Sequence, residues 1–351
     1  MKKLTIYVLA FCIASAMYGR SMAFEYDSPA GRACRGEVLC PDSVAGNVVA
    51  IFVQHRLQSE EQLRLWYGGL VDNLLRQGVS CCFYENRLDN PQAAGGALSW
   101  FDMADDAIAV YEALRGMTSF KDAKIGFVGA SEAGCSALVA AASVSAPGFL
   151  VQLVSPVENP LLIEMQVITR DRMMRNYMRN AWGRFIDMPF NVYTSIFQDI
   201  LQDIRDKKIG ERDTYIERLY ERHATAIKGE REVFVRQLNA FLTVYCDRQG
   251  NGQRLAWDAE RYYRKLECPM LYVSALHDTH ILCFPNVVRL EKIMHKHRKS
   301  NFNVVVVDAT HNLNRYNRDR KHWEGERDDT EHPKKDEVFD AVMRWIAVNV
   351  G

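Results

Sequence analysis

What the sequence lacks limits the class of protein it encodes. Its 44 basic and 44 acidic side chains give a formal net charge of zero, which argues against nucleic acid as a partner. It has no Cys-x-x-Cys pair, no Cys/His cluster with structural-zinc spacing and no propeller-like repeat. What is present, 351 residues of which 48% are hydrophobic, is enough for an α/β core and one extra helical subdomain.

The N-terminus has the pattern of a secretory signal. Residues 1–3 are Met-Lys-Lys and carry two positive side chains, residues 4–17 form an apolar run, and residues 21–23 are Ser-Met-Ala, with cleavage expected after Ala23. The apolar run is shorter than the roughly 20 residues of a bilayer-spanning helix, so we expect no stable membrane anchor after cleavage. This interpretation predicts an exported protein, periplasmic or secreted.

Eight of the nine cysteines lie beyond the predicted signal, where an exported chain meets oxidising conditions. Cys34 and Cys40 are expected to bracket a short loop and are the best candidates for a disulfide. Buried free thiols are at least as good an interpretation of four others: Cys81, Cys82, Cys135 and Cys268.

Apolar runs alternate with helical patterns, which predicts an α/β fold with a doubly wound, mainly parallel sheet. A Ser99-to-Asp102 capping box opens one helix, and apolar residues at helical spacing from Val338 to Val348 close the chain. The predicted strands are residues 48–53, 79–84, 124–128, 149–154, 270–275 and 303–307.

Residues 160–267 break this alternation, because they contain helical patterns only. We therefore expect three parts: a signal at 1–23, a core formed by 24–159 and 268–351, and a helical lid inserted at 160–267. Ligands of open α/β sheets bind outside the carboxyl ends of the strands, so the lid is predicted to cover that edge.

The segment around Ser131 predicts a strained turn between the third strand and an alanine-rich helix. Gly129 and Ala133 are small, as a serine held between a strand and a helix requires. Ser131 is the candidate nucleophile, because this turn exposes its hydroxyl beside the N–H groups at the start of the helix.

A base and an acid follow at the ends of two later strands. Asp278 comes after strand 270–275 and His311 after strand 303–307, in the order Ser, Asp, His. Alternative acids are Glu158 and Asp308, and alternative bases are His277 and His280. A metal site at His277, Asp278 and His280, with His295 and His297, is not expected, because these residues lie on a loop and at a basic helix end.

On these residues the chain resembles the α/β-hydrolase superfamily, in particular bacterial lidded serine esterases and acyl-thioesterase-type hydrolases. Residues 84–87 are similar to a strand-end segment of the family, and 155–162 to its entry into the lid. The resemblance implies a Ser131-Asp278-His311 triad, a small-molecule ester or acyl substrate, and no cofactor or metal.

The first core loop departs from the family. Members commonly have a His-Gly pair where this chain has Gln54 and His55. The resemblance implies oxyanion N–H groups from Glu132 and from Gln54 or His55. Arg56, whose guanidinium could bind a substrate carboxylate or phosphate, and Trp182, in the aromatic-rich insertion, are candidate substrate-binding residues. The departure leaves open a non-catalytic binding protein on this fold. The same triad leaves open a serine peptidase or amidase. An adaptor role for segment 315–336 is a further alternative, and the sequence does not predict the oligomeric state.

Overall fold

The computed structural model describes most of the α/β part of the chain and a portion of the helical insertion. The described residues are 20–29, 31–42, 47–55, 59–85, 99–159, 195–196, 199–200, 202–203, 206, 208–227, 231–242, 257–316 and 336–351. None of the described helices is both long enough and apolar enough to cross a lipid bilayer.

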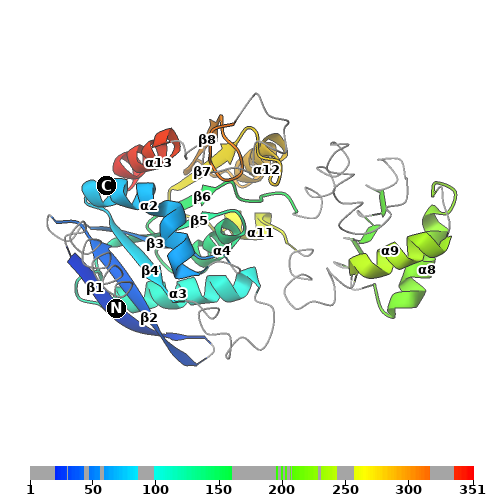
Figure 1. The fold of residues 1–351 in the computed structure, drawn as a ribbon, viewed down its shortest axis with the longest axis horizontal. Coiled ribbons are helices and arrows are strands. Elements are labelled where there is room, and N and C mark those ends of the chain that lie inside the picture. Colours follow the sequence, from blue (N-terminus) through cyan, green and yellow to red (C-terminus); the bar gives the residue numbers. More distant parts are fainter. Residues whose placement is uncertain are drawn as a thin grey trace, which may run out of the picture.

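An eight-stranded sheet forms the centre of the described structure (Figure 1). Its order is β1-β2-β4-β3-β5-β6-β7-β8. The pairs β1–β2 and β2–β4 are antiparallel, and every later pair in this order is parallel. The strands are β1 (Arg20–Ser28), β2 (Arg32–Cys40), β3 (Val48–Phe52), β4 (Ser80–Tyr84), β5 (Lys124–Ala130), β6 (Leu150–Leu153), β7 (Met270–Ala275) and β8 (Phe302–Val307).

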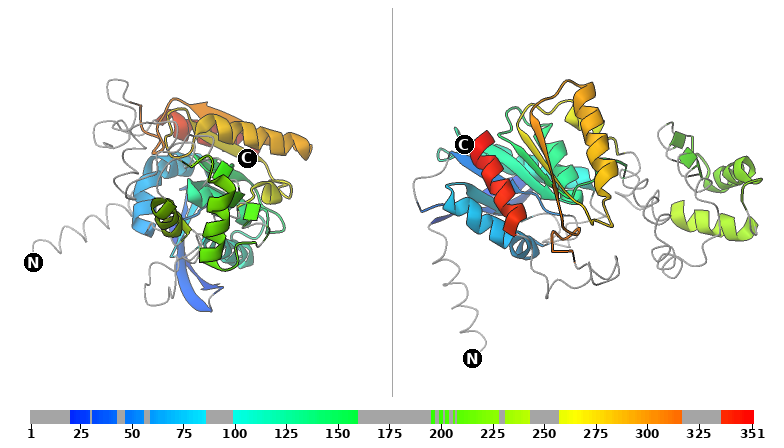
Figure 2. Two further views of the ribbon diagram at one scale, coloured as in Figure 1. Left: turned by 90° about the vertical axis from the view of Figure 1, so that its right-hand side faces the viewer. Right: turned by 90° about the horizontal axis from the view of Figure 1, so that it is seen from above.

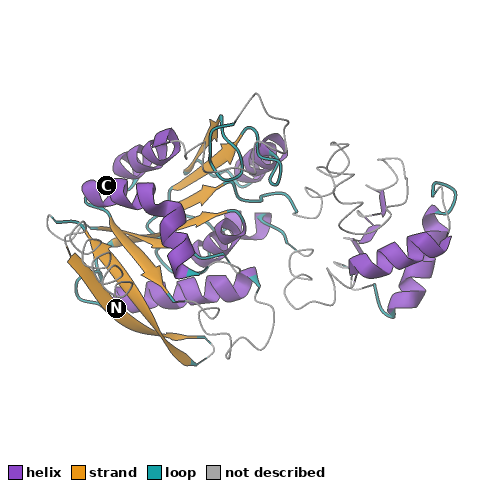
Figure 3. Cartoon of the chain, in the orientation of Figure 1, coloured by secondary structure: helices purple, strands orange, loops and turns teal. Residues whose placement is uncertain are grey.

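Helices cover both faces of the sheet (Figure 3). On one face lie α2 (Glu60–Arg76) and α13 (Asp336–Asn349). On the other lie α3 (Trp100–Gly116), α4 (Glu132–Ala141), α11 (Glu260–Tyr263) and α12 (Cys283–Lys296). Strands β3, β4, β6 and β7 are buried along their whole length. Their mainly apolar sequences are those expected of strands that helices cover on both faces. The predicted doubly wound fold is confirmed.

The six predicted strands correspond to β3 through β8, with shifts of at most two residues at their ends. The predicted capping box is also present: Asp102 N donates to Ser99 Oγ over 3.2 Å, and Ser99 N donates to the Asp102 carboxylate over 2.8 Å. The box fixes the start of α3, whose apolar face packs against α4.

Strands β1 and β2 were not predicted, and they change two expectations. The predicted Cys34–Cys40 disulfide is wrong: both cysteines lie on β2 and are free thiols. They are six positions apart along the strand, a rise of about 20 Å, which is beyond the reach of a disulfide. The expected cleavage point after Ala23 falls inside β1, where Ala23 is paired with Glu37.

Two long helices, α8 (Arg212–His223) and α9 (Arg231–Leu242), are described within residues 160–267, and they pack on each other. Figure 2 shows them beside the α/β part of the chain rather than on either face of its sheet. Apolar residues of the helical patterns predicted in this stretch are buried at Ile196, Ile200, Phe234 and Leu238. A lid over the strand ends stays a prediction, because the residues linking these helices to the core lie outside the described ranges.

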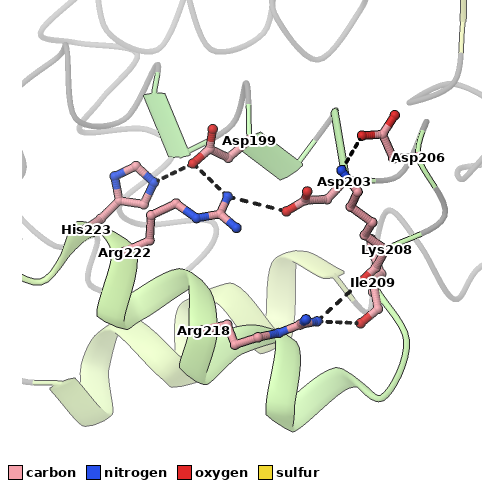
Figure 4. Close-up of polar contacts among 8 residues, drawn as sticks. All are labelled: Asp199, Asp203, Asp206, Lys208, Ile209, Arg218, Arg222 and His223. Atoms are coloured by element: carbon pink, nitrogen blue, oxygen red, sulfur yellow. Dashed lines mark hydrogen bonds and ion pairs between the residues drawn. The ribbon is translucent and has the colours of Figure 1, made fainter.

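Ion pairs join the segment before α8 to the last turn of that helix (Figure 4). Asp199 accepts from His223 Nε2 and Arg222 Nη1, both over 2.9 Å, and Arg222 also lies 3.5 Å from Asp203. Although burial opposes it, hydrogen bonds from Arg222 and His223 hold the pKa of Asp199 below its ordinary value. These contacts hold this small helical unit together.

Candidate active site

Ser131 lies at the junction of β5 and α4, in a backbone conformation that L-residues rarely adopt. Its φ is 54° and its ψ is −128°, a strained region found where structure around a residue enforces it. The turn is held from two sides, because Ser131 N donates to Leu153 O of β6 and Gly134 N donates to Ser131 O. Although Ser131 is the N-cap residue of α4, its hydroxyl makes no capping bond, so it is directed elsewhere.

Two glycines allow the close approach of strand and helix at this turn. A Cβ on Gly129 would lie 2.4 Å from the carbonyl oxygen of Ala133, and a Cβ on Gly134 would lie 1.7 Å from Ser155 Oγ. Neither site has room for a side chain. Ala133, the small residue predicted after the serine, is buried at this turn.

The structure brings the three predicted side chains together from three loops. His311, on the loop after β8, places Nε2 3.1 Å from Ser131 Oγ and Nδ1 2.8 Å from Asp278 Oδ2. Asp278, on the loop after β7, has a fully buried side chain, and its other oxygen accepts from the backbone N–H groups of His280 and Ile281 over 2.8 and 2.6 Å. These bonds leave one carboxylate oxygen facing the imidazole.

The alternative acids and bases are placed differently. Asp308 pairs with His277 over 2.8 Å, and Glu158 accepts from the Asn159 N–H. His280 lies beside His311, with ring centroids 4.9 Å apart. The ligand atoms of Asp278, His280 and His311 lie within 4.8 Å of one another and could hold a metal ion. A metal there would take nitrogen and oxygen atoms that Ser131, His311 and Asp278 already use in their contacts.

The expected oxyanion residues lie on two elements that their side chains connect. Glu132 opens α4, and the first N–H groups of a helix have no acceptor within it. His55, on the loop after β3, places Nε2 3.0 Å from Glu132 Oε2. The pair therefore links the loop after β3 to the residue that follows Ser131.

Gln54 is fully buried and faces away from this pair. Its Nε2 donates to the Tyr84 carbonyl oxygen over 2.5 Å. Burial raises the pKa of Tyr84, and a contact with the backbone of Gln54 opposes that effect. Both contacts direct Gln54 towards β4, so His55 is the better candidate for the second oxyanion N–H.

A cavity of about 240 Å³ opens beside Ser131 on the α2 face of the sheet. His55, His311 and Asn312 line it together with Ser131, and apolar residues complete it: Val53, Leu63, Trp66 and Val154. Tyr67 also lines it and is 1% exposed. The predicted substrate-binding residues Arg56 and Trp182 lie outside the described residues.

Sequence reasoning missed Leu63, Trp66 and Tyr67, which α2 supplies to the cavity. A helical apolar pattern was available from Leu63 through Tyr67 to Leu70, directly after the first core loop. That pattern identifies a buried face but does not distinguish a residue that lines a cavity from one in the core.

No family model and no curated protein matches this chain. Solved structures do resemble it. An esterase of Pyrococcus furiosus has 12% identity and a TM-score of 0.56, with 96% of this chain and 94% of that one covered. Dienelactone hydrolase from Anabaena variabilis has 12% identity and a TM-score of 0.50, with 95% and 99% covered. An acylaminoacyl peptidase of Pyrococcus horikoshii has 10% identity and a TM-score of 0.52, with 97% of this chain but 43% of that one covered. At these identities the likeness is one of fold.

Proposed function

We propose that this chain, which has the α/β-hydrolase fold, is a serine hydrolase that cleaves a carboxylic ester or thioester through an acyl-enzyme. The observation that carries the proposal is the row of contacts from Ser131 Oγ through His311 to Asp278, at 3.1 and 2.8 Å. A nucleophile, a base and an orienting acid in hydrogen-bonding reach are what this chemistry requires.

The proposed first step forms a bond between Ser131 Oγ and the acyl carbon. His311 Nε2 takes the hydroxyl proton during the attack and then gives it to the leaving alkoxide or thiolate as its bond to the acyl carbon breaks. Asp278 holds the imidazole in the tautomer that presents Nε2 as acceptor and stabilises the imidazolium that forms. Water, activated by the same imidazole, then releases the acid and restores Ser131.

The negative charge of the tetrahedral intermediate would be stabilised by backbone N–H groups. Glu132 supplies one at the start of α4, and His55 is the better placed of the two candidates in the loop after β3. One such donor is worth on the order of a hundredfold in rate. The contact between the His55 and Glu132 side chains would fix the positions of their two backbone N–H groups relative to each other.

The cavity favours a small acyl group. Its volume of about 240 Å³ lies below the roughly 300–1,000 Å³ of sites for drug-sized ligands, and its lining is largely apolar. We include export in the proposal, on the charged, apolar and small-residue order of residues 1–23.

Hydrolysis of p-nitrophenyl esters from acetate to decanoate, with the matching p-nitroanilides, tests this function. We expect turnover of short esters, slower cleavage of the anilides, and a loss of about a thousandfold or more in Ser131→Ala and in His311→Ala. Turnover that survives in folded Ser131→Ala would refute the assignment. Faster cleavage of anilides than of esters would favour the amidase alternative.

A further inference from the structure

The side chain of His280 lies beside the proposed triad, and the proposed mechanism does not use it. Asp278 Oδ1 accepts from the backbone N–H groups of His280 and Ile281 over 2.8 and 2.6 Å. The bonds that orient the acid therefore also fix the turn that carries His280. Its ring lies next to that of His311, with ring centroids 4.9 Å apart.

Asp278, His280 and His311 together form a group of metal-binding side chains. One ligand atom from each lies within 4.8 Å of the other two. Among the residues that the structure describes, no other group of three or more His, Cys, Asp and Glu side chains gathers its ligand atoms this closely. Two imidazole nitrogens and one carboxylate oxygen suit a divalent transition-metal ion such as zinc, whereas magnesium and calcium prefer oxygen ligands.

The separations are close to those that a zinc ion needs. Zinc bonds of about 2.0–2.1 Å in a tetrahedral arrangement place two ligand atoms roughly 3.3 Å apart. His311 Nδ1 and Asp278 Oδ2 already lie 2.8 Å apart, so His280 is the side chain that has to move closer. Because His280 is exposed, a rotation of its ring can make this movement without displacing buried groups. Water can supply the fourth ligand.

The metal site and the working triad exclude each other, because both need His311. An ion on Nε2 would occupy the nitrogen that lies 3.1 Å from Ser131 Oγ, so that His311 could no longer accept the hydroxyl proton. An ion on Nδ1 would replace the proton that this nitrogen shares with Asp278, and that proton would pass to solvent. Either bond removes the base that ester cleavage requires.

We propose that Asp278, His280 and His311 form an inhibitory site for a divalent transition-metal ion of the zinc type, which competes with Ser131 for His311 and reversibly inhibits the hydrolase. The inhibition rests on the proposed function, whereas binding of the ion does not. In this proposal the ion is an inhibitor and not a cofactor, and His280 is the ligand that distinguishes the metal site from the triad.

Calorimetric titration of the untagged chain with zinc chloride tests the site without reference to activity. We expect His280→Asn to weaken zinc binding by about tenfold or more, because it removes a ligand. Ser131→Ala should bind zinc at least as tightly as the wild type, because the hydroxyl no longer contacts His311. His277→Asn is the matched control: it lies on the same loop, but its Nε2 contacts Asp308 over 2.8 Å. It should bind zinc as the wild type does.

Ester hydrolysis at increasing zinc concentration then tests the inhibition, with each protein compared with its own rate without metal. The concentration that halves the rate should be about tenfold or more higher in His280→Asn than in the wild type, and unchanged in His277→Asn. Magnesium and calcium at the same concentrations should not inhibit. Addition of EDTA should restore the full rate, because no covalent bond is made.

The remaining outcomes overturn the inference. No binding of zinc to the folded wild type up to about 1 mM, or equal affinities in the wild type and His280→Asn, would refute the site. Equal weakening in His277→Asn and His280→Asn would refute the assignment of His280. Binding through His280 without loss of rate would refute the competition for His311. A wild type that binds zinc through His280, but cleaves no ester and is not labelled at Ser131 by a covalent probe, would refute the proposed function instead.

Discussion

Replacing Gly129 with alanine is expected to disable the site while leaving all three proposed catalytic side chains in the sequence. The new Cβ would lie 2.4 Å from Ala133 O, 2.7 Å from Ala133 C and 2.8 Å from Gly134 N. These are backbone atoms in the first turn of α4, so no side-chain rotation relieves the overlap. Ordinary contact is about 1 Å longer, so α4 must move away from β5 by a similar amount.

A movement of that size would disrupt the contact between Ser131 and His311. Their atoms are 3.1 Å apart, and about 1 Å more would exceed hydrogen-bonding distance. A misplacement of this order costs about a hundredfold in rate, and overpacking of this kind about 1–3 kcal/mol in stability. We therefore expect a loss of about a hundredfold in kcat/KM and a lower urea midpoint.

The assay is ester hydrolysis together with urea unfolding followed by circular dichroism. Gly116→Ala is the matched control, because a Cβ there meets nothing within 4 Å and alanine favours a helix by up to about 1 kcal/mol. It should keep full activity with an unchanged or higher midpoint. A Gly129→Ala enzyme with wild-type activity and stability would refute the reasoning about the turn.

Two further predictions concern charged contacts. Glu132→Ala should lower kcat about tenfold with little change in KM, because it removes the contact that holds His55 to the residue after the nucleophile. Glu132→Gln should lower kcat less, because its amide oxygen can still accept a hydrogen bond from His55. An effect confined to KM would contradict this role of Glu132. Hydrogen bonds from Lys296 and His297 lower the pKa of Glu260 to about 2, so the stability this carboxylate adds is present above its ordinary value of 4.5 and is lost as the pH falls towards 2. Glu260→Gln should therefore lower the free energy of unfolding by about 1 kcal/mol at pH 7, given solvent screening of the pairs. In urea titrations this loss should become progressively smaller below about pH 4.5. A difference in unfolding free energy that does not depend on pH would contradict the prediction.

The parallel part of the sheet was predictable from the sequence because its strands are buried on both faces. Such strands form continuous apolar runs, as residues 48–52 and 270–275 do. The antiparallel strands β1 and β2 alternate buried and exposed residues. Their pattern was hidden by the signal-like N-terminus and by two cysteines that suggested a loop.

The contacts among Ser131, Asp278 and His311 could be anticipated because parallel strands end at one edge of the sheet. Each residue follows a strand directly, so topology alone places the three loops together. The cavity wall could not be anticipated in the same way. Whether Tyr67 lines a cavity or fills the core depends on how α2 packs against β3 and β5, which helical periodicity does not determine.

The most direct test of the central claim is covalent labelling of the folded protein with a fluorophosphonate, followed by mass spectrometry of its peptides. We expect one adduct, on Ser131, which is absent in Ser131→Ala and forms much more slowly in His311→Ala, since the imidazole must accept the hydroxyl proton. No adduct on the folded wild type, or an adduct on a different serine at the same rate in all three proteins, would contradict it.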